Sequence, residues 1–558
     1  MDNKYALGIH IGHDRSVSII KNGELIGHLA QERIDRIKHS HSPNYPYEAI
    51  ECLLKKLRLK ISDIQSIGVS YSHVEIPQIK SILKEEFFEK YSLKDNTGFY
   101  GVSHHLSHAE STFSSSGFGE SLILVADGSG DFVGDKLESE SLYFGNANGI
   151  RLLERRLQDS LFSYVTRKNF YIYPFMNDGD KFKQISLGRK YEQLTYMLGF
   201  GWGQAGKTMG LASYGKSPIE FPHILMKHFN FDLNLKYLLE DIYTLQQGSS
   251  LSFYRYIQRN KADIAKTAQD FIENYSLALI DYIQGKYPHE NLCLAGGLFL
   301  NCVLNHKILA KTKFKRLFII PAAGDDGQSI GAAYAAYKMH FKQFMVNKDF
   351  SPFLGLKYSD NSILKALEAK KLYFEKLTTK QLVNKASKAL SQGKIVGLLR
   401  GKSECGPRAL CHRSILANPT LKGTKRLLNK KVKFREMFRP YAPVIVAEKQ
   451  FDYFNLKADS PFMLYSTSVK KKYRRMLPSI THIDGSARVQ SISKQSDNFM
   501  YALLLNFEKV SGFPILLNTS FNTNNEPIVE SPLDAISTFL RTEMDFLIIE
   551  NYWIEKIN

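Results

Sequence analysis

Twice in this chain, an apolar stretch typical of a buried strand runs into a loop of aspartate and glycine. Ser121 to Ala126 is followed by Asp127-Gly128-Ser129-Gly130, and Leu317 to Pro321 is followed by Gly324-Asp325-Asp326-Gly327. Polar loops at the ends of buried strands are typical of mixed α/β proteins, in which ligands bind beside those ends. The recurrence predicts a duplicated α/β fold whose two related halves close on a ligand.

The N-terminal residues predict a sheet that begins with a hairpin. Tyr5 to Ile11 is apolar, Val17 to Ile20 is β-branched, and Asn22-Gly23 is a strong turn signal before Leu25 to Ala30. We expect this hairpin to approach a nucleotide phosphate. The apolar spacing that follows predicts helices over 47–57 and 76–87, with a strand over 67–70 between them.

The length of 558 residues exceeds what one hydrophobic core usually organises, so two or three domains are expected. Around Val346 to Lys357 the pattern loosens into a polar stretch with proline and glycine, and helices and strands restart at Ile363. We therefore expect a domain boundary near residue 350, which divides the chain into 1–350 and 351–558.

Composition predicts a soluble protein of the cytoplasm. The chain has no 18-residue apolar run and no signal pattern at its N-terminus, so we expect neither a membrane span nor export. Five cysteines without a CxxC pair disfavour a zinc knuckle and a disulfide framework. The net charge of +19 favours anionic partners. Nucleic acid is an unlikely one, because the basic cluster at 470–475 is typical of a solvated loop.

Two arginines in the second half of the chain indicate an anion site. Arg408 and Arg413 lie in SECGPRALCHRSIL, after a Gly-Pro turn and among small residues, and NTSFN follows at 518–522. Guanidinium groups in such a setting can bind phosphate or carboxylate oxygens with two hydrogen bonds. Arginine pairs near glycine also occur as surface salt bridges, and the motif alone does not separate the two interpretations.

Histidines and aspartates in the first half indicate a metal site. His104 and His108 are one helical turn apart, so both imidazoles can face one metal if the segment is helical. Asp127 and Asp325, at strand ends, could complete the set of ligands. The residue after His104 is His105 rather than glutamate, which argues against a zinc protease. Two histidines with carboxylates suit iron(II) or manganese, with zinc as an alternative.

Glycine-containing loops in the first half are candidate nucleotide contacts. Gly296-Gly297 follows the strand 292–294 and precedes a predicted helix near Asn301, and Gly128 follows Asp127. Glycine lets backbone N–H groups approach a phosphate or ribose, although a glycine pair is also common in simple turns. Lys207 is a further phosphate candidate, but its surroundings, AGKTMGLA, lack the first glycine of a Walker loop.

His13, after the first strand, and Lys38 are candidates for group transfer. A neutral histidine can take a proton from a hydroxyl nucleophile, and a lysine can stabilise developing negative charge. A hydrogen-bonded structural histidine and a surface lysine are the alternative interpretation.

Ten motifs, in order, resemble the O-carbamoyltransferase family, which includes nodulation proteins and antibiotic-tailoring enzymes. They are GxHxGHDxS, ERxxRxKH, HHLSHAxS, GKxMGLAxYG, AGGxxLN, GDDG, GPRALxxRS, KFREMFRPYAP, THIDGSARVQ and NTSFN, and they cover nearly the whole chain. The resemblance implies an N-terminal domain of the actin-like ATPase superfamily, similar to the tRNA threonylcarbamoyl transferase, and a C-terminal YrdC-like α/β domain.

The resemblance also implies a reaction. The C-terminal domain would make carbamoyl-adenylate from carbamoyl phosphate and ATP with Mg²⁺, and the N-terminal domain would pass the carbamoyl group to a hydroxyl of a small molecule, sugar or natural product. A homodimer would be compatible with this activity.

Site residues follow from the resemblance position by position. The four metal candidates would bind iron(II) or another divalent metal, and His13, with Lys38 beside it, would lie nearest the acceptor hydroxyl. The carbamoyl phosphate and ATP site would consist of Arg408, Arg413, Lys433, Arg439, Arg488, Asn518 and Ser520.

Five positions depart from the family pattern: Arg15, Ala205, Cys405, Cys411 and His412. Arg15 replaces an alanine and Ala205 a glutamate near the expected acceptor mouth, and Arg15 would suit an anionic acceptor. Cys411-His412 replaces Gly-Asn. Two other functions stay open: a tRNA threonylcarbamoyl-type transferase, and a nucleotide-binding regulator that has lost its chemistry.

Overall fold

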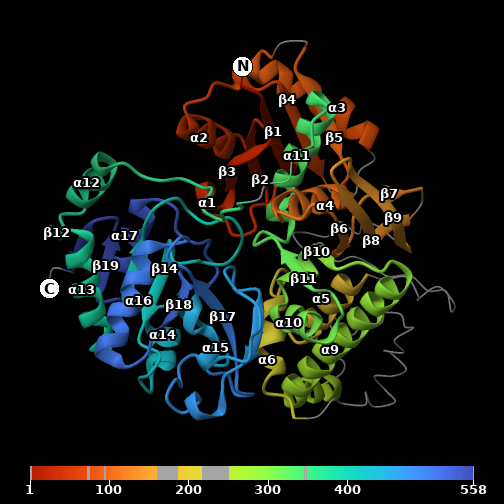
Figure 1. The fold of residues 1–558 in the computed structure, drawn as a ribbon. Helices are drawn as coiled ribbons and strands as arrows, with labels where there is room; N and C mark the ends of the chain where they lie inside the picture. The colour runs from red at the N-terminus through yellow and green to blue at the C-terminus, as the bar shows by residue number, and fades with distance from the viewer. Residues whose placement is uncertain are drawn as a thin grey trace.

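The computed structural model describes residues 3–71, 76–93, 96–134, 136–159, 186–216, 251–344, 346 and 349–556. The strands of this part of the chain form three mixed sheets (Figure 1). Two sheets consist of residues before 320, and the third consists of residues after 372. This is the mixed α/β architecture that the sequence predicts.

The first sheet has the strand order β3-β2-β1-β4-β5. It contains β1 (Tyr5–Ile11), β2 (Ser16–Lys21), β3 (Glu24–Ala30), β4 (Ser66–Tyr71) and β5 (Gly98–Val102). β1, β2 and β3 run antiparallel, whereas β4 and β5 are parallel to β1. Asn22 and Gly23 both adopt positive φ, at 51° and 85°, as the predicted hairpin turn requires.

The second sheet repeats this arrangement. β9 (Gly149–Asp159), β8 (Lys136–Asn146) and β6 (Ser121–Ala126) run antiparallel, and β10 (Asn291–Ala295) and β11 (Arg316–Ile319) continue parallel to β6. The short β7 (Phe132–Val133) also pairs with β8. Strand order and direction match those of the first sheet, which confirms the predicted duplication.

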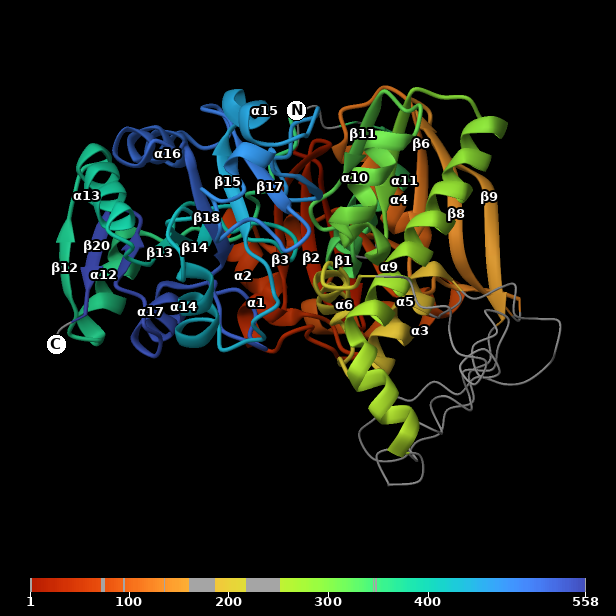
Figure 2. The same ribbon diagram turned by 90° about the horizontal axis from the view of Figure 1, so that it is seen from below.

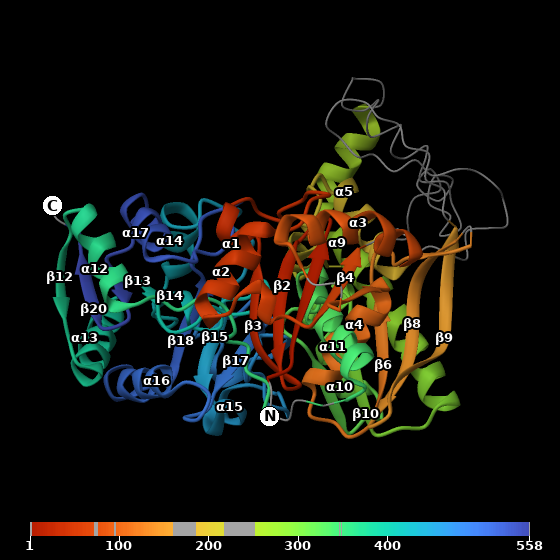
Figure 3. The ribbon, with the colours of Figure 1, turned by 90° about the horizontal axis from the view of Figure 1, so that it is seen from above.

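Two helices, α4 (His104–Ser115) and α11 (Gln328–Phe341), pack against each other between the two sheets (Figures 1 and 3). A Cβ on Gly8 of β1 would lie 1.9 Å from the Ser329 carbonyl oxygen, and one on Gly331 would lie 1.7 Å from the Ser107 carbonyl oxygen. Only glycine fits such contacts. The small residues of α11 therefore hold α4 at a fixed place relative to both sheets.

The other helices of residues 3–344 cover the outer faces. They include α1 (Glu32–Asp35), α2 (Tyr47–Leu57), α3 (Ile76–Tyr91), α5 (Leu187–Met197), α6 (Ala205–Ala212), α9 (Leu251–Lys286) and α10 (Cys302–Lys311). The helices predicted over 47–57 and 76–87 are thus present. No helix in the described ranges is long and apolar enough to cross a membrane.

The third sheet has nine strands in the order β12-β20-β19-β13-β14-β18-β15-β17-β16. Their bounds are β12 (Tyr373–Lys376), β13 (Val396–Leu399), β14 (Arg413–Ala417), β15 (Ala442–Val446), β16 (Tyr465–Ser468), β17 (Ser486–Ile492), β18 (Ile515–Ser520), β19 (Phe546–Ile549) and β20 (Tyr552–Glu555). The main helices here are α12 (Asp360–Ala369), α13 (Thr379–Ser391), α14 (Thr424–Lys431), α16 (Asn498–Ser511) and α17 (Pro532–Leu540).

Short segments join the two parts of the molecule, which lie side by side in Figure 2. Arg36, after α1, donates to the Pro527 and Ile528 carbonyls, and Arg33 donates to the Gly406 carbonyl. The stretch around Leu354, which leads into the C-terminal part, is fixed to the first sheet, because His28 N–H donates to the Leu354 carbonyl. We keep residue 350 as the proposed domain boundary.

Candidate functional site

The four predicted metal ligands converge beside the second sheet. His104 begins α4 and His108 lies one turn further along it, Asp127 follows β6, and Asp325 begins a short 3₁₀ turn. Both Nε2 atoms lie near Asp127 Oδ2, at 3.0 Å for His104 and 3.2 Å for His108. They lie 3.4 Å and 3.3 Å from Asp325 Oδ1. One donor atom from each residue falls within 4.8 Å of the others, so the group is a candidate site for a divalent cation.

The charges of this cluster also suit a cation. Burial alone would lower the pKa of His104, but Asp325 and Asp127 outweigh it and raise that pKa well above its usual value. Two adjacent buried carboxylates repel each other unless positive charge lies between them. Nitrogen and oxygen donors in this combination fit iron(II), manganese or zinc.

The glycine loops hold the cluster in place. Gly297 N–H donates to Asp127 Oδ1 over 3.1 Å, which leaves Oδ2 facing the histidines. Gly296 has φ of 102°, and a Cβ there would lie 2.1 Å from the Ala126 carbonyl oxygen. In this structure, the predicted nucleotide contacts Gly296 and Gly297 therefore orient a carboxylate.

Two other predicted nucleotide contacts are engaged within the protein. The Asn301 side chain caps α10 by accepting from Leu304 N–H, and its amide donates to Gln269. The Gly128 carbonyl accepts from Gln158, Ser186 and Arg189. These contacts show that Asn301 and Gly128 stabilise loops in this structure. Sequence spacing alone does not distinguish such a structural role from ligand binding.

His13 adjoins the cluster and is open to solvent on one side. Its Nε2 lies 3.1 Å from Asp325 Oδ2, its Nδ1 lies 3.1 Å from Asp14 Oδ2, and its side chain is 36% exposed. Burial would lower the pKa of His13, but Asp325 and Asp14 raise it to about 9. Asp14 Oδ1 also lies 2.8 Å from His39 Nδ1. Asp14 therefore links two imidazoles and holds the His13 ring in one orientation.

Trp202 borders the same opening. Its ring meets those of His13 and His39 edge to face, with centroids 5.1 Å and 5.2 Å apart, and it is 40% exposed.

The guanidinium group of Arg15 is engaged within the protein. It donates to Ser40, Asp35 and the Asn44 carbonyl, so its charge is already neutralised. This geometry does not support our expectation that Arg15 recognises an anionic acceptor.

Lys433 and Ser520 meet in the C-terminal part. Lys433 Nζ lies 2.8 Å from the Ser520 carbonyl oxygen, 3.2 Å from Ser520 Oγ and 2.8 Å from the Asn522 carbonyl oxygen. Burial, followed by the nearby Arg435 and Arg439, lowers the pKa of Lys433 well below its usual value. An anion bound here would offset the like charges of the neighbouring arginines and favour the ammonium form of Lys433.

Four guanidinium groups form a cluster beside Lys433. They belong to Arg408, Arg435, Arg439 and Arg488, and each has at least one of the others as an electrostatic neighbour. Burial and these like charges lower the pKa of Arg408 to about 9 and that of Arg439 to about 10. Asp326, near Arg408, and Glu436, near Arg439, are the main acids beside them. We call this set the arginine cluster.

Arg413 departs from the prediction of a substrate-binding arginine. It is fully buried, and its three nitrogens donate to the carbonyls of Leu356, Arg400, Gly401, His412 and Glu530. It therefore binds loops together. Asn518 is also buried, and its amide donates to Ala409 and Gln490. Neither residue offers the free donor that we expected.

Lys207 and Lys38 bring the N-terminal part to the arginine cluster. Lys207 Nζ lies 2.6 Å from Glu436 Oε1. Lys38, which has an exposed side chain, has Arg439 and Lys207 among its electrostatic neighbours. Arg408 in turn lies 3.4 Å from the Leu300 carbonyl oxygen, through Nη2. The cationic groups of both parts therefore face one region between them.

Comparison with known proteins decides the family. The family model described as carbamoyltransferase N-terminus matches residues 80–334, and the one described as carbamoyltransferase C-terminus matches 387–556. The nodulation protein NolNO of Sinorhizobium fredii is 32% identical over 98% of this chain and 79% of its own length. The chain belongs to the carbamoyltransferase family. Both the enzyme class and the family resemblance found in the sequence are thereby confirmed.

Other relatives of this carbamoyltransferase are similar over most of their length. An uncharacterised protein of Methanocaldococcus jannaschii is 30% identical over 99% of both chains, and nodulation protein U of Rhizobium tropici is 26% identical over 92% of this chain and 90% of its own. Among solved structures, full-length HypF in a phosphate- and nucleotide-bound form has a TM-score of 0.38 at 14% identity, covering 60% of this chain and 55% of HypF.

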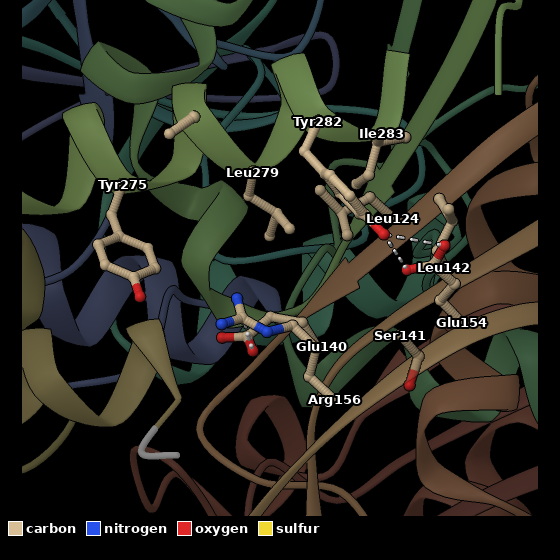
Figure 4. A pocket seen from close by; sticks show the side chains of 11 residues that line it. Leu124, Glu140, Ser141, Leu142, Glu154, Arg156, Tyr275, Leu279, Tyr282 and Ile283 are labelled. Atoms are coloured by element: carbon tan, nitrogen blue, oxygen red, sulfur yellow. Dashed lines mark hydrogen bonds and ion pairs between the residues drawn. The ribbon is translucent and has the colours of Figure 1, made fainter. Parts of the chain in front are cut away.

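A separate cavity of about 460 Å³ lies in the N-terminal part of the carbamoyltransferase, between α9 and strands β8 and β9 (Figure 4). Tyr275 and Tyr282 from α9 line it together with Glu140, Glu154 and Arg156. Its carboxylates already have partners: Glu154 accepts from Tyr282 and Tyr287, and Glu140 from Leu187 N–H. None of the predicted site residues lines this cavity.

The prediction missed Arg435, Asn522, Asp14 and His39. Arg435 and Asn522 lie inside the quoted motifs KFREMFRPYAP and NTSFN, where the basic or polar residue types were the available signal. Asp14 and His39 each follow a predicted transfer residue directly, and both adopt positive φ, at 53° and 55°. Their position next to His13 and Lys38 was the only signal in the sequence that could have indicated this pair.

Proposed function

We propose that this carbamoyltransferase makes carbamoyl-adenylate from carbamoyl phosphate and ATP, and then transfers the carbamoyl group to a hydroxyl of a small-molecule or sugar acceptor. The first half-reaction consumes one water and releases phosphate and pyrophosphate. In the second, the acceptor oxygen forms a bond to the carbamoyl carbon and the bond to AMP breaks. AMP leaves with its electron pair, and the hydroxyl proton passes to a base.

The arginine cluster with Lys433 is the observation that carries this proposal. Carbamoyl phosphate and Mg²⁺-bound ATP together bring several negative charges into one place. The like charges of Arg408, Arg439 and Arg488 are costly to hold together unless an anion lies among them. The cluster therefore suits the activation half-reaction better than a role in protein stability.

Each group of the cluster has a definable role. The planar guanidinium groups would bind phosphate oxygens with paired hydrogen bonds. The Ser520 hydroxyl, which donates to Asn522 Oδ1 over 2.7 Å in this structure, would supply a neutral donor after turning toward the ligand. Lys433 would neutralise charge that develops on the leaving pyrophosphate or phosphate. Its contacts with Ser520 and Asn522 fix the ammonium group before substrate arrives.

His13 would serve the transfer step as the base for the acceptor hydroxyl. Only neutral imidazole can accept this proton, and compensation of the Asp325 charge by a bound cation favours that form. A divalent cation held by His104, His108, Asp127 and Asp325 would supply Lewis-acid charge to the phosphate of the adenylate. Lys38, beside Arg439, would neutralise the departing AMP.

Pyrophosphate release tests the activation step without knowledge of the acceptor. Purified protein with a divalent metal is mixed with ATP and carbamoyl phosphate, and pyrophosphate and carbamoyl-adenylate are followed by mass spectrometry. Release should depend on carbamoyl phosphate and fall by about 100-fold or more in Arg408→Ala. Arg426→Ala, an exposed arginine on α14, is the matched control and should retain full activity.

Two outcomes would favour the other functions. Pyrophosphate release that requires threonine and bicarbonate in place of carbamoyl phosphate would indicate a threonylcarbamoyl-type transferase. Tight ATP binding with no pyrophosphate release from any donor, in folded metal-loaded protein, would indicate a nucleotide-binding regulator.

A further inference from the structure

His10, the last residue but one of β1, is a buried histidine with an unusual environment. Its side chain has no exposed surface, and neither ring nitrogen has a hydrogen-bond partner among the described residues. A buried polar group without a partner typically costs about 1–3 kcal/mol, so each such group calls for an explanation. If the side chain at position 10 served only apolar packing on β1, leucine or phenylalanine would do so equally well.

The ring of His10 lies beside the candidate metal site. Its Nε2 atom lies 3.8 Å from Asp325 Oδ2, and its centroid lies 6.1 Å from that of His104. The two carboxylate oxygens of Asp325 therefore face different pairs of histidines. Oδ1 faces His104 and His108, and Oδ2 faces His10 and His13.

We propose that His10 is a positioning residue for the metal site, which donates its Nε2–H to Asp325 Oδ2 while Oδ1 binds the cation. The inference rests on the metal site of the proposed function. The present distance of 3.8 Å is about 0.7 Å longer than a hydrogen bond, a gap that a small rotation of the carboxylate closes. Residues that hydrogen-bond to a metal ligand fix its orientation, and their loss typically costs about 10–100-fold in metal affinity.

His13 cannot perform this task throughout the reaction. It also contacts Asp325 Oδ2, at 3.1 Å, but it is partly exposed and is the proposed base for the acceptor. The same Nε2 atom would have to take the proton of the acceptor hydroxyl, so it cannot hold Asp325 Oδ2 during that step. His10 has no access to solvent and keeps its place on β1, so it holds the carboxylate independently of the proton transfer.

Direct metal titration tests the role of His10 without any measurement of carbamoyl transfer. Co²⁺ is titrated into chelator-treated protein and followed by its visible absorption. In His10→Phe, which keeps a ring and removes the donor, the Kd for Co²⁺ should rise about 10–100-fold. His10→Gln places an amide N–H near the position of Nε2 and should restore most of the affinity.

His28 offers a matched control. It is also buried on the first sheet, and its Nε2 has no hydrogen-bond partner among the described residues, but its Nδ1 faces Ser18 rather than one of the four metal candidates. His28→Phe should bind Co²⁺ as the unaltered protein does. Equal affinity of His10→Phe and unaltered protein, an equal loss in His28→Phe, or no recovery in His10→Gln would each overturn the proposal.

A second measurement covers the case in which His10→Phe does not fold. In unaltered protein labelled with ¹⁵N-histidine and loaded with Zn²⁺, His10 should carry its proton on Nε2, and a proton on Nδ1 alone would refute the proposed donor. Pyrophosphate release by the same preparations reports on the activation step separately. A loss of Co²⁺ affinity with intact pyrophosphate release therefore supports the inference whether or not an acceptor is known.

Discussion

Lys207 Nζ lies 2.6 Å from Glu436 Oε1, and this ion pair joins α6 of the N-terminal part to the loop that carries Arg435 and Arg439 of the arginine cluster. Glu436 Oε2 also lies 3.9 Å from Arg439. The carboxylate of Glu436 therefore sits among cations that would otherwise face an anionic ligand. It neutralises part of the positive charge that would otherwise attract the proposed substrates.

Removal of this carboxylate charge should strengthen nucleotide binding. In Glu436→Gln, the Kd for Mg²⁺-ATP should fall about 2–5-fold at low ionic strength, because a competing negative charge is lost from a half-exposed site. Isothermal titration calorimetry would measure the change. Glu543→Gln, which removes the partner of Lys431 in an exposed pair, is the control and should leave the Kd unchanged. Weaker ATP binding in Glu436→Gln would mean that Glu436 positions Lys207 for the ligand.

The two proposed half-reactions should separate by mutation. Lys433→Met should lower pyrophosphate release about 100-fold or more, because the buried ammonium group beside Ser520 is lost. His13→Asn should still form carbamoyl-adenylate while transfer to an acceptor, once one is found with unaltered enzyme, falls about 10²–10⁴-fold. Quenched-flow measurement of both products would decide. Loss of adenylate formation in His13→Asn would contradict this division of labour.

Glu110, buried on α4 two residues after His108 and with Ser114 as a hydrogen-bond donor, should make stability depend on pH. Burial raises its pKa to about 7. Between the unfolded pKa near 4.5 and this value the folded state binds more protons than the unfolded state, so the free energy of unfolding falls as pH rises. Glu110→Gln should therefore be more stable than unaltered protein at pH 8, by about 2–3 kcal/mol, and no more stable near pH 4.5.

Denaturant unfolding at a series of pH values would measure this difference. Glu89→Gln, which changes an exposed glutamate on α3, is the control and should leave the pH profile unchanged. A stability difference for Glu110→Gln that stays constant from pH 5 to 8 would mean that Glu110 is ionised throughout.

The sequence predicted the first strands and helices well because local signals agree with the tertiary fold there. Asn22-Gly23 can adopt the positive φ values that a tight hairpin needs, and the apolar run Tyr5–Ile11 is buried along its whole length as β1. The duplication was predicted from the two Asp-Gly loops, but in the structure both loops follow strands of the second sheet, β6 and β11, so they bring Asp127 and Asp325 together and do not mark the two repeats. Helical spacing at His104 and His108 placed two imidazoles on one face of α4.

The sequence could not show which arginines have free donors, because the partners of a guanidinium group come from distant loops. Arg413 and Arg408 have similar sequence surroundings, yet Arg413 is enclosed by carbonyls as remote as Leu356 and Glu530. Arg435 joins the cluster instead. Residue type and spacing indicate that an arginine is near a turn, but only the folded chain decides whether its donors are already used.

Cys411 provides a test of backbone strain at a position where the family pattern has glycine. It is fully buried with φ of 82°, a conformation that costs a non-glycine residue about 1 kcal/mol or more. Cys411→Gly should therefore be more stable than Cys411→Ala, by about 1 kcal/mol, although glycine is the smaller residue and usually the less stable one. Cys293, buried on the regular strand β10, is the matched control, and there the alanine variant should be the more stable. Thermal unfolding of the four variants measures both differences. The same order at both positions, with alanine above glycine, would show that Cys411 stores no strain.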